Sequence, residues 1–380
     1  MELPTVSAPV DDPGEGLAVA VVGGGAVGTT VAYDLARRGA AVTLYEADAI
    51  GGGATYRSAG ICHDAFVDPT DAAVAGEGID RLRRVSGDDT FAFHECPYVW
   101  FARDGDDERV AELEAGIQRM QAEGVIALEV DADALEERFP AMTVEDIATG
   151  GIAGAAGYLD PVRYTACLAA AARGAGADLV TETAVSLETD PVRVVTDEEE
   201  HAVDAVVVAA GAASGSLLSA AGCPVALQPV AVQAAILEAP PLEAMWQDCT
   251  TGCYGRPHPD GVVAGNGTLE RVEPDGSLET DPAVTEHIRE AVTDRVGAVE
   301  GVERSWTGRC VATPDGLPLV GAVTDGVFVA SGFEGQGILR APAVGERLAD
   351  QVCGGAGIAA YDPTRVDPDE PIPLERSGPP

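Results

Sequence analysis

Apolar runs that end in glycine occur at three distant points of the chain. "AVAVVGGGAVG" begins at Ala18, "AVVVAAG" begins at Ala205, and "VFVASGFEGQG" begins at Val327. An unbroken apolar run bounded by turn residues is typical of a strand that is buried on both faces. Ligands bind outside the carboxyl ends of such strands in open α/β sheets. We therefore expect the three glycine segments to meet at one edge of a parallel sheet.

Helical spacing of apolar residues alternates with these strands. "AVGTTVAYDLARRG" follows the first strand and ends at Gly39, and "AAVTLYE" then reads as a second strand, which completes a βαβ unit. Segments 178–214 and 223–302 read mainly as short strands joined by turns. Further helices are predicted over 106–124, 132–140, 161–176, 281–296 and 338–352.

The composition is acidic throughout. The 380 residues include 63 Asp and Glu against 23 Lys and Arg, for a formal net charge of −40, and all 23 basic residues are arginine. A dispersed acidic excess without lysine is typical of a protein from a salt-rich cytoplasm, where screening reduces self-repulsion. The charge argues against nucleic-acid or anionic-membrane binding, because both require basic patches.

The sequence gives little support for a secreted protein, a membrane-spanning protein or a metal site. The first residues, "MELPTVSAPVDDPGEG", have no basic and apolar signal pattern, and no apolar run is long enough to cross a bilayer. The 8 cysteines and 5 histidines are scattered, and Cys249 and Cys253 have the wrong spacing for a common zinc site. We expect a cytoplasmic protein without a metal site.

The first glycine turn carries a dinucleotide-binding fingerprint. Gly23, Gly25 and Gly28 form G-x-G-x-x-G between a strand and a helix, and Glu46 ends the next strand. The glycines admit a pyrophosphate to the helix N-terminus, and the carboxylate binds ribose hydroxyls. An acid at position 46 would repel the extra phosphate of NADP, so NAD or FAD is favoured.

Two later glycine-rich stretches favour FAD over NAD. "GGGATYRSAGI" (51–61) can pass beneath an extended cofactor. "GFEGQG" (332–337) precedes a predicted helix, whose positive N-terminal dipole would stabilise the negative charge of a reduced flavin. NAD has no comparable need for a glycine-rich element this late in the chain.

These segments together resemble the D-amino-acid oxidase-like FAD-dependent oxidoreductases, the family of glycine oxidase, sarcosine oxidase and D-amino-acid dehydrogenases. The resemblance covers roughly residues 17–355. The motifs that carry it, in chain order, are "VAVVGGGAVG", "GGGATYRSAGI", "GYLDPVRYTACLAAAARGAG", "DAVVVAAGAAS", "WTGRCVATPDGLPLVG" and "GFEGQGILRAPAVGERLAD".

The resemblance implies an α/β fold with a Rossmann-like FAD-binding domain made of discontinuous segments. It also implies an α+β substrate domain with an antiparallel sheet. The FAD-binding domain is expected to comprise 16–88, 143–222 and 303–361, and the substrate domain 89–142 and 223–302. Residues 1–15 are expected to be a flexible leader, and 362–380 an extended tail.

The implied activity is oxidation of the C–N bond of a small amino acid or secondary amine, by hydride transfer to flavin N5. Glycine, sarcosine and D-amino acids are the substrate types that the resemblance suggests. No general base is strictly needed if the amine binds neutral. Two alternatives stay open: oxidation of a 2-hydroxy acid, and a flavin subunit of a multicomponent dehydrogenase.

The resemblance also places cofactor contacts residue by residue. Gly23, Gly25 and Gly28 would meet the pyrophosphate and Glu46 the ADP ribose. Further cofactor contacts are implied for Arg57, Ser58, Val185, Gly211, Gly332, Gly335, Gln336 and Gly337, of which the last four would border the isoalloxazine.

The family's substrate-binding residues are not matched position for position. The two carboxylate-binding arginines of glycine oxidase-like members fall on Cys310 and Gly335, and the lysine of sarcosine oxidase-like members falls on Leu339. A covalent cysteine link to FAD is not expected, because Cys310 lies two positions beyond that cysteine. The candidates left for the substrate are Tyr254, Arg256, Arg309 and Arg340.

The absence of lysine bears on the electron acceptor. Sarcosine oxidase-like enzymes activate O₂ with a lysine above the flavin, and this chain contains none. The sequence therefore slightly favours a dehydrogenase that reduces another carrier, with an oxidase still open.

Overall fold

The three apolar runs form neighbouring strands of one sheet. In the computed structural model, which describes residues 13–87, 90–240 and 242–374, the runs become β20, β13 and β1, and these pair in that order. All pairs are parallel except β19 with β20. From one edge to the other, the six strands are β19 (Leu319–Thr324), β20 (Val327–Ser331), β13 (Ala205–Val208), β1 (Ala18–Val22), β2 (Ala41–Tyr45) and β9 (Asp178–Val180).

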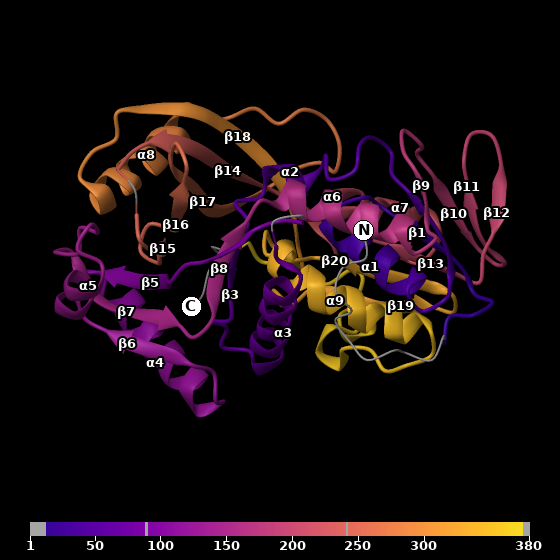
Figure 1. Cartoon of the computed structure of the whole chain (residues 1–380), viewed down its shortest axis with the longest axis horizontal. Helices are drawn as coiled ribbons and strands as arrows, with labels where there is room; N and C mark the ends of the chain where they lie inside the picture. Colours follow the sequence, from indigo (N-terminus) through magenta and orange to yellow (C-terminus); the bar gives the residue numbers. More distant parts are fainter. Residues whose placement is uncertain (1–12, 88–89, 241, 375–380) are drawn as a thin grey trace.

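Both faces of this sheet are covered, which explains its unbroken apolar strands. Val19 and Val21 pack among the helices on one face, whereas Ala20 and Val22 pack against the other layer. The helices are α1 (Ala26–Ala36), α3 (Pro69–Val85), α6 (Pro161–Gly174) and α9 (Gly337–Val352). The other layer holds β10 (Ser186–Thr189), β11 (Val192–Val195), β12 (Glu200–Ala202), η1 (Gly211–Ala213) and α7 (Ser214–Ala220) (Figure 1).

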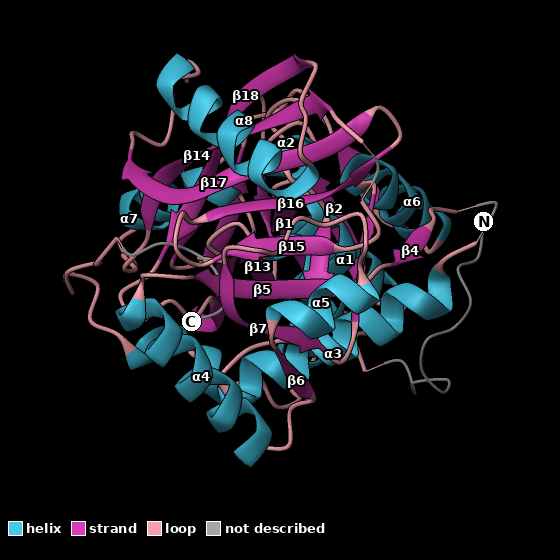
Figure 2. Ribbon diagram, turned by 90° about the vertical axis from the view of Figure 1, so that its left-hand side faces the viewer, coloured by secondary structure: helices cyan, strands magenta, loops and turns pink. Residues whose placement is uncertain are grey.

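A second, larger sheet lies beside the first. Its neighbouring strands are antiparallel except for β15 with β5. Helices α5 (Ala132–Arg138) and α8 (Pro282–Val296) pack on one face, where Val99 and Phe101 point, as Figure 2 shows. Helix α4 (Asp107–Ala122) packs on the other face, with Trp100. The strand order is β18 (Gly301–Ala312), β14 (Gln228–Glu238), β17 (Gly261–Arg271), β16 (Cys253–His258), β15 (Met245–Asp248), β5 (Tyr98–Arg103), β7 (Ile147–Ala153) and β6 (Ala127–Val130).

A small antiparallel sheet lies between the two larger ones (Figure 1). Its order is β3 (Ile61–His63), β8 (Ala156–Leu159) and β4 (Phe93–Glu95). The remaining elements are α2 (Ala54–Arg57), η2 (Ala359–Tyr361) and η3 (Pro363–Arg365).

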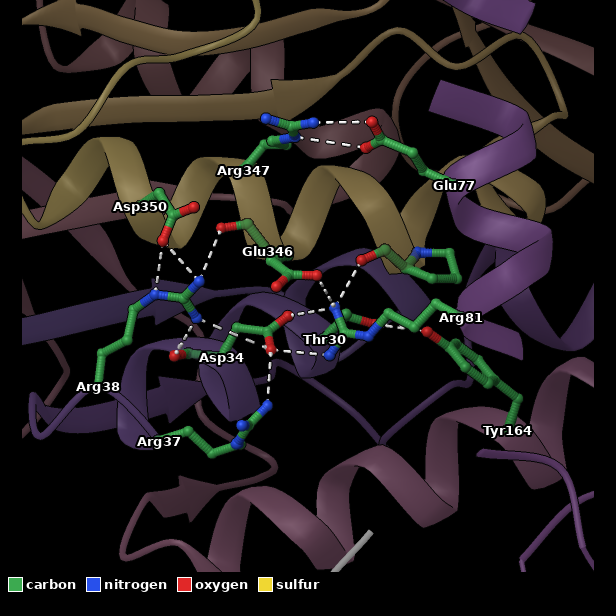
Figure 3. Close-up of polar contacts among 11 residues, drawn as sticks. Thr30, Asp34, Arg37, Arg38, Glu77, Arg81, Tyr164, Glu346, Arg347 and Asp350 are labelled. Atoms are coloured by element: carbon green, nitrogen blue, oxygen red, sulfur yellow. Dashed lines mark hydrogen bonds and ion pairs between the residues drawn. The ribbon is translucent and has the colours of Figure 1, made fainter. Parts of the chain in front are cut away.

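Buried ion pairs hold the helical layer together. Both carboxylate oxygens of Asp34 on α1 accept hydrogen bonds of 2.7 Å from Arg81 on α3. Arg81 also donates to the carbonyl of Pro342 on α9, so one guanidinium joins three helices (Figure 3). Both Asp34 and Arg81 are buried, and such a pair is costly to break because the partner left behind keeps its charge.

The predicted division into two domains stays a prediction. Two strands nonetheless pair outside their expected ranges, because β7 in 143–222 and most of β18 in 303–361 belong to the eight-stranded sheet. Strand partners are decided by tertiary pairing, which local patterns do not reveal.

The structure describes the tail as far as residue 374. Arg365 in η3 donates hydrogen bonds of 2.7 and 2.8 Å to the Asp315 carboxylate, and Ile372 is only 9% exposed. This ion pair and the apolar contact anchor residues 362–374 against the fold. Residues 1–12 of the expected leader and 375–380 of the tail lie outside the described residues. Among those described, no helix is long and apolar enough to cross a membrane.

Candidate active site

A cavity of about 1060 Å³ runs from the first glycine turn to the inner face of the eight-stranded sheet. The loops after β1, β13 and β20 all line it. The expectation that the three glycine segments meet at one sheet edge is therefore confirmed. The rest of the wall comes from residues 45–63, 183–185 and 307–311, and from single residues of the large sheet.

The first turn leaves no room for side chains. Gly23 has φ +110°, and a Cβ there would lie 2.4 Å from the carbonyl oxygen of Ala209. A Cβ on Gly28 would lie 1.9 Å from the Gly23 carbonyl oxygen, so this glycine permits close packing of α1 on the turn. Gly23 and Gly25 line the cavity, whereas Gly28 does not. Gly28 therefore packs against the turn, and its contact with a ligand stays a prediction.

Glu46 braces the same turn from the end of β2. Its Oε2 accepts a 2.6 Å hydrogen bond from Gly24 N, and its Oε1 accepts one of 2.9 Å from Asp48 N. A carboxylate has about four acceptor positions, so it can also accept from ligand hydroxyls. Glu46 lines the cavity, as does Val185 nearby.

Three further predicted cofactor residues line the cavity between the first turn and α9. Arg57 and Ser58 line it, and Arg57 Nη1 donates to the carbonyls of Gly52 and Gly53 at 3.1 Å. Gly211 also lines this part and has φ +55°.

The amino end of α9 borders the cavity farther along. Gly332, Gly335, Gln336 and Gly337 all line it, and the first two have φ of +83° and +86°. A Cβ on Gly332 would lie 2.3 Å from Thr313 Cγ2. The backbone at these two positions thus has a positive φ, which glycine adopts readily and which is strained for other residues.

The helices that begin at the cavity differ from other helices in how their first residues are capped. Helices α3, α6 and α8 begin at Asp68, Asp160 and Asp281, whose carboxylates accept backbone N–H bonds. Helices α1 and α9 begin at Gly25 and Gln336, which make no side-chain capping bond, and neither helix has an acid in its first turn. Two partly positive helix ends therefore point at the cavity, where a bound anion is stabilised.

The inner face of the large sheet supplies the far wall. Tyr98, Gln247 and Tyr254 line it from β5, β15 and β16. A Cβ on Gly265 would lie 2.4 Å from the Tyr254 ring, so this glycine makes room for the tyrosine. Burial raises the pKa of Tyr254, so its hydroxyl stays protonated at neutral pH.

Arg309 is the predicted substrate arginine that lines the cavity. Its Nε donates to Glu273 O at 3.0 Å, and its Nη2 donates to the carbonyls of Asp275 and Gly276. These bonds hold the segment 273–279 over the cavity, and four members of that segment line it: Pro274, Gly276, Ser277 and Leu278. Within the described part of the chain, Arg309 Nη1 has no such carbonyl partner and can bind a ligand anion.

Arg340 and Arg256 do not line the cavity, which argues against both as substrate ligands. Arg340 donates to both carboxylate oxygens of Asp71 at 3.0 and 2.8 Å, and to Gln336 Oε1 at 2.6 Å. Arg256 donates to the carbonyls of Ala59 and Pro257. Their guanidinium groups are thus bound within the protein.

Sequence reasoning missed three groups in the wall. His63, Gln247 and Glu334 line the cavity, although His63 and Gln247 lie outside the quoted motifs and Glu334, within "GFEGQG", is not among the predicted site residues. Glu334 is a non-glycine residue with φ +48°, and burial raises the pKa of its carboxyl. Non-glycine residues in this backbone region are uncommon and cluster at functional sites, which is the signal that a structure adds.

Cys310 also lines the cavity, and burial raises the pKa of its thiol to about 12. Such a thiol is not a ready nucleophile. Among the described residues, no group of three His, Cys, Asp or Glu is placed to hold a metal ion.

The comparisons with known proteins agree with this geometry. Residues 18–351 match the family model DAO, described as FAD dependent oxidoreductase. The chain is 28% identical over 376 residues to a 4-methylaminobutanoate oxidase (formaldehyde-forming) of Paenarthrobacter nicotinovorans, over 91% of this chain and 44% of that protein. It is 29% identical over 367 residues to a glycine oxidase of Bacillus licheniformis, over 88% of this chain and 92% of that protein. The chain thus spans less than half of the first relative and most of the second.

Solved structures with a similar fold include two related enzymes. L-proline dehydrogenase from P. horikoshii has a TM-score of 0.83 and 25% identity, covering 92% of this chain and 98% of that one. Glycine oxidase from Geobacillus kaustophilus has a TM-score of 0.81 and 23% identity, covering 92% and 99%. At 23% identity, the similarity to this glycine oxidase structure supports the fold alone.

Proposed function

Because the chain belongs to the DAO family of FAD-dependent oxidoreductases, we propose that it oxidises the C–N bond of a small amino acid or secondary amine. The glycine oxidase and 4-methylaminobutanoate oxidase relatives act on compounds of this type by their names. The observation that carries the proposal is the continuous cavity, which joins a dinucleotide cradle to a wall containing Arg309 and Tyr254.

The residues present fit FAD. The Gly23 turn excludes side chains where a pyrophosphate must approach, and Glu46 closes the adjoining end of the cavity. The residues that would hold the cofactor along the cavity are Gly23, Gly25, Glu46, Arg57, Ser58, Val185, Gly211, Gly332, Gly335, Gln336 and Gly337. FAD, when bound, supplies the acceptor for a hydride from the carbon beside the amine nitrogen.

The protein's part in the reaction is orientation and electrostatics. Arg309 would bind the substrate carboxylate through Nη1, since a guanidinium–carboxylate hydrogen bond is charge-assisted. The uncapped N-terminus of α9 would stabilise the negative charge that develops at this end of the cavity. The segment 273–279 lies at the cavity and would restrict the entry of water.

The composition of the chain bears on the electron acceptor. No lysine is available to activate O₂, so we propose that a carrier other than O₂ is the preferred oxidant.

A bleaching experiment tests the proposal. The purified, yellow protein is mixed anaerobically with glycine, sarcosine, proline and D-amino acids in molar salt, and flavin absorbance is followed. Bleaching by at least one of these supports amine oxidation. Bleaching by 2-hydroxy acids alone would replace the proposal with C–O oxidation. Absence of bleaching by any small molecule would point instead to a flavin subunit that only transfers electrons.

A further inference from the structure

His63 occupies a fixed place in the cavity wall. It ends β3, is only 4% exposed and lines the cavity. Its imidazole stacks on the Tyr98 ring at 4.2 Å between centroids with an interplanar angle of 1°, and on the Phe66 ring at 4.8 Å and 21°. Two aromatic rings thus fix the plane of the imidazole at the end of the cavity that is formed by the large sheet.

The polar part of this side chain lacks a partner within the described part of the chain. His63 Nδ1 is buried and makes no hydrogen bond there. A buried polar atom without a partner costs about 1–3 kcal/mol, and such atoms in native proteins call for an explanation. Nε2 also has no hydrogen-bond partner among the described residues and is not buried in the same way, so a ligand in the cavity can bind the imidazole through Nε2.

The imidazole is uncharged at every physiological pH. Burial, together with the positive charge of Arg340, holds its pKa at about 3. The Arg340 guanidinium lies 4.6 Å from the centre of the Phe66 ring, with which His63 stacks. A neutral imidazole offers one N–H donor and one nitrogen acceptor. It can therefore bind a neutral polar group without an opposite charge.

The two ends of an amino-acid substrate need different partners. A carboxylate is bound best by a guanidinium, and Arg309 lines the same cavity. An amine can release a hydride from its carbon only when the nitrogen lone pair is free, so the nitrogen must be neutral. A carboxylate partner would strongly favour the protonated ammonium, whereas a neutral acceptor does so much less and leaves burial to favour the uncharged amine.

We propose that His63 is a specificity-determining residue that accepts a hydrogen bond from the substrate amine without adding a negative charge that would keep the amine protonated. The inference rests on the proposed amine-oxidising function. It assigns the nitrogen of the substrate to the His63–Tyr98 side of the cavity and the carboxylate to the Arg309 side.

Matched ligands and variants test the assignment. Sarcosine is compared with butanoate, which has a methylene in place of the amine, in the wild type and in H63F, H63N and H94F. Apparent sarcosine affinity comes from anaerobic flavin reduction, and butanoate affinity from the change in flavin absorbance. H63F retains an aromatic ring for the stack, H63N retains a donor and an acceptor, and H94F is a control on the same small sheet, where His94 stacks on Tyr158 outside the cavity.

The expected result is selective. H63F weakens sarcosine binding at least ~10-fold, as for loss of one hydrogen bond to a buried group. It leaves butanoate affinity and flavin content unchanged, H63N recovers part of the loss, and H94F behaves as wild type. Equal weakening of sarcosine and butanoate, or no weakening of either, would overturn the role of His63. If the wild-type flavin is not reduced by sarcosine, the fastest amine of the bleaching panel and its methylene analogue replace the pair. If no amine reduces it, the proposed function fails, and the inference fails with it.

Discussion

Arg340 on α9 and Asp71 on α3 form a buried bidentate ion pair, with Nε and Nη2 donating to the two carboxylate oxygens at 3.0 and 2.8 Å. Tyr361 also donates to this carboxylate, and the third guanidinium nitrogen donates to Gln336 at the start of α9. The pair thus fixes the helix end that borders the cavity, while keeping Arg340 itself away from it.

Breaking this pair should destabilise the protein strongly. Asp71→Asn leaves the Arg340 charge buried without its partner, and removal of one partner of a buried pair costs about 3–5 kcal/mol. Glu77→Gln on the same helix is the control, because Glu77 and its partner Arg347 are about half exposed and such pairs contribute about 0–1 kcal/mol. Urea unfolding in molar salt measures both. Equal losses in the two variants would contradict the assignment.

Gly28→Ala should remove bound flavin. The added methyl would lie 1.9 Å from the Gly23 carbonyl oxygen, so α1 must move away from the turn that holds the pyrophosphate. Gly76→Ala on α3 is the control, since a Cβ there meets nothing within 4 Å. Flavin absorbance per protein, measured after purification, should fall in G28A and stay constant in G76A. A G28A protein with a full complement of bound flavin would show that the turn tolerates the shift.

Arg309→Met should lower kcat/KM for a substrate with a carboxylate by about 10- to 100-fold, because a hydrogen bond to a charged group contributes about 1.5–3 kcal/mol. Its effect on an amine without a carboxylate should be small. Arg304→Met is the matched control, because Arg304 lies on the same strand and over the Tyr56 and Trp306 rings. Comparable losses in both variants would place the carboxylate elsewhere.

His63 should make folding sensitive to mild acid. Burial lowers the pKa of His63 from 6.5 to about 3 in the folded protein. Below pH 6.5, the His63 imidazole is therefore protonated in the unfolded chain but stays neutral in the folded chain. The free energy of unfolding therefore falls as the pH drops from 6.5, by about 2 kcal/mol at pH ~5 from this residue. H63F should flatten this part of a pH series of denaturant unfolding. An unchanged slope would mean that His63 is protonated in the folded state.

High salt should stabilise the fold. With a net charge of −40, self-repulsion opposes the compact state, and the Debye length falls from ~10 Å at ~0.1 M to ~3 Å at ~1 M salt. The melting temperature should rise with KCl over this range, as thermal scans of the flavin-loaded protein would show. A melting temperature that is independent of KCl would count against adaptation to a salt-rich cytoplasm.

The cofactor half of the site could be predicted from the sequence because its signals are local. The Gly23–Gly28 turn, Glu46 at the end of the next strand, and the glycines before α9 each combine a strand, a turn and a helix within a few residues. Parallel strands then bring these turns to one edge, as β20, β13 and β1 show. Helix α3 is not among the predicted elements, although Asp68 and Pro69 mark its start.

The substrate half was decided only by the tertiary structure. Adjacent helix positions point about 100° apart, so Leu339 lines the cavity while Arg340 turns to Asp71. The contacts that decide these roles join residues far apart in the chain. Arg256 donates to Ala59, Arg309 donates to Glu273, and His63 stacks on Tyr98. The sequence alone determined that a dinucleotide cradle exists, because the strand, the glycine turn and the helix that form it are consecutive in the chain. Which side chains face it depends on how distant strands and helices pack, and only the folded chain establishes that.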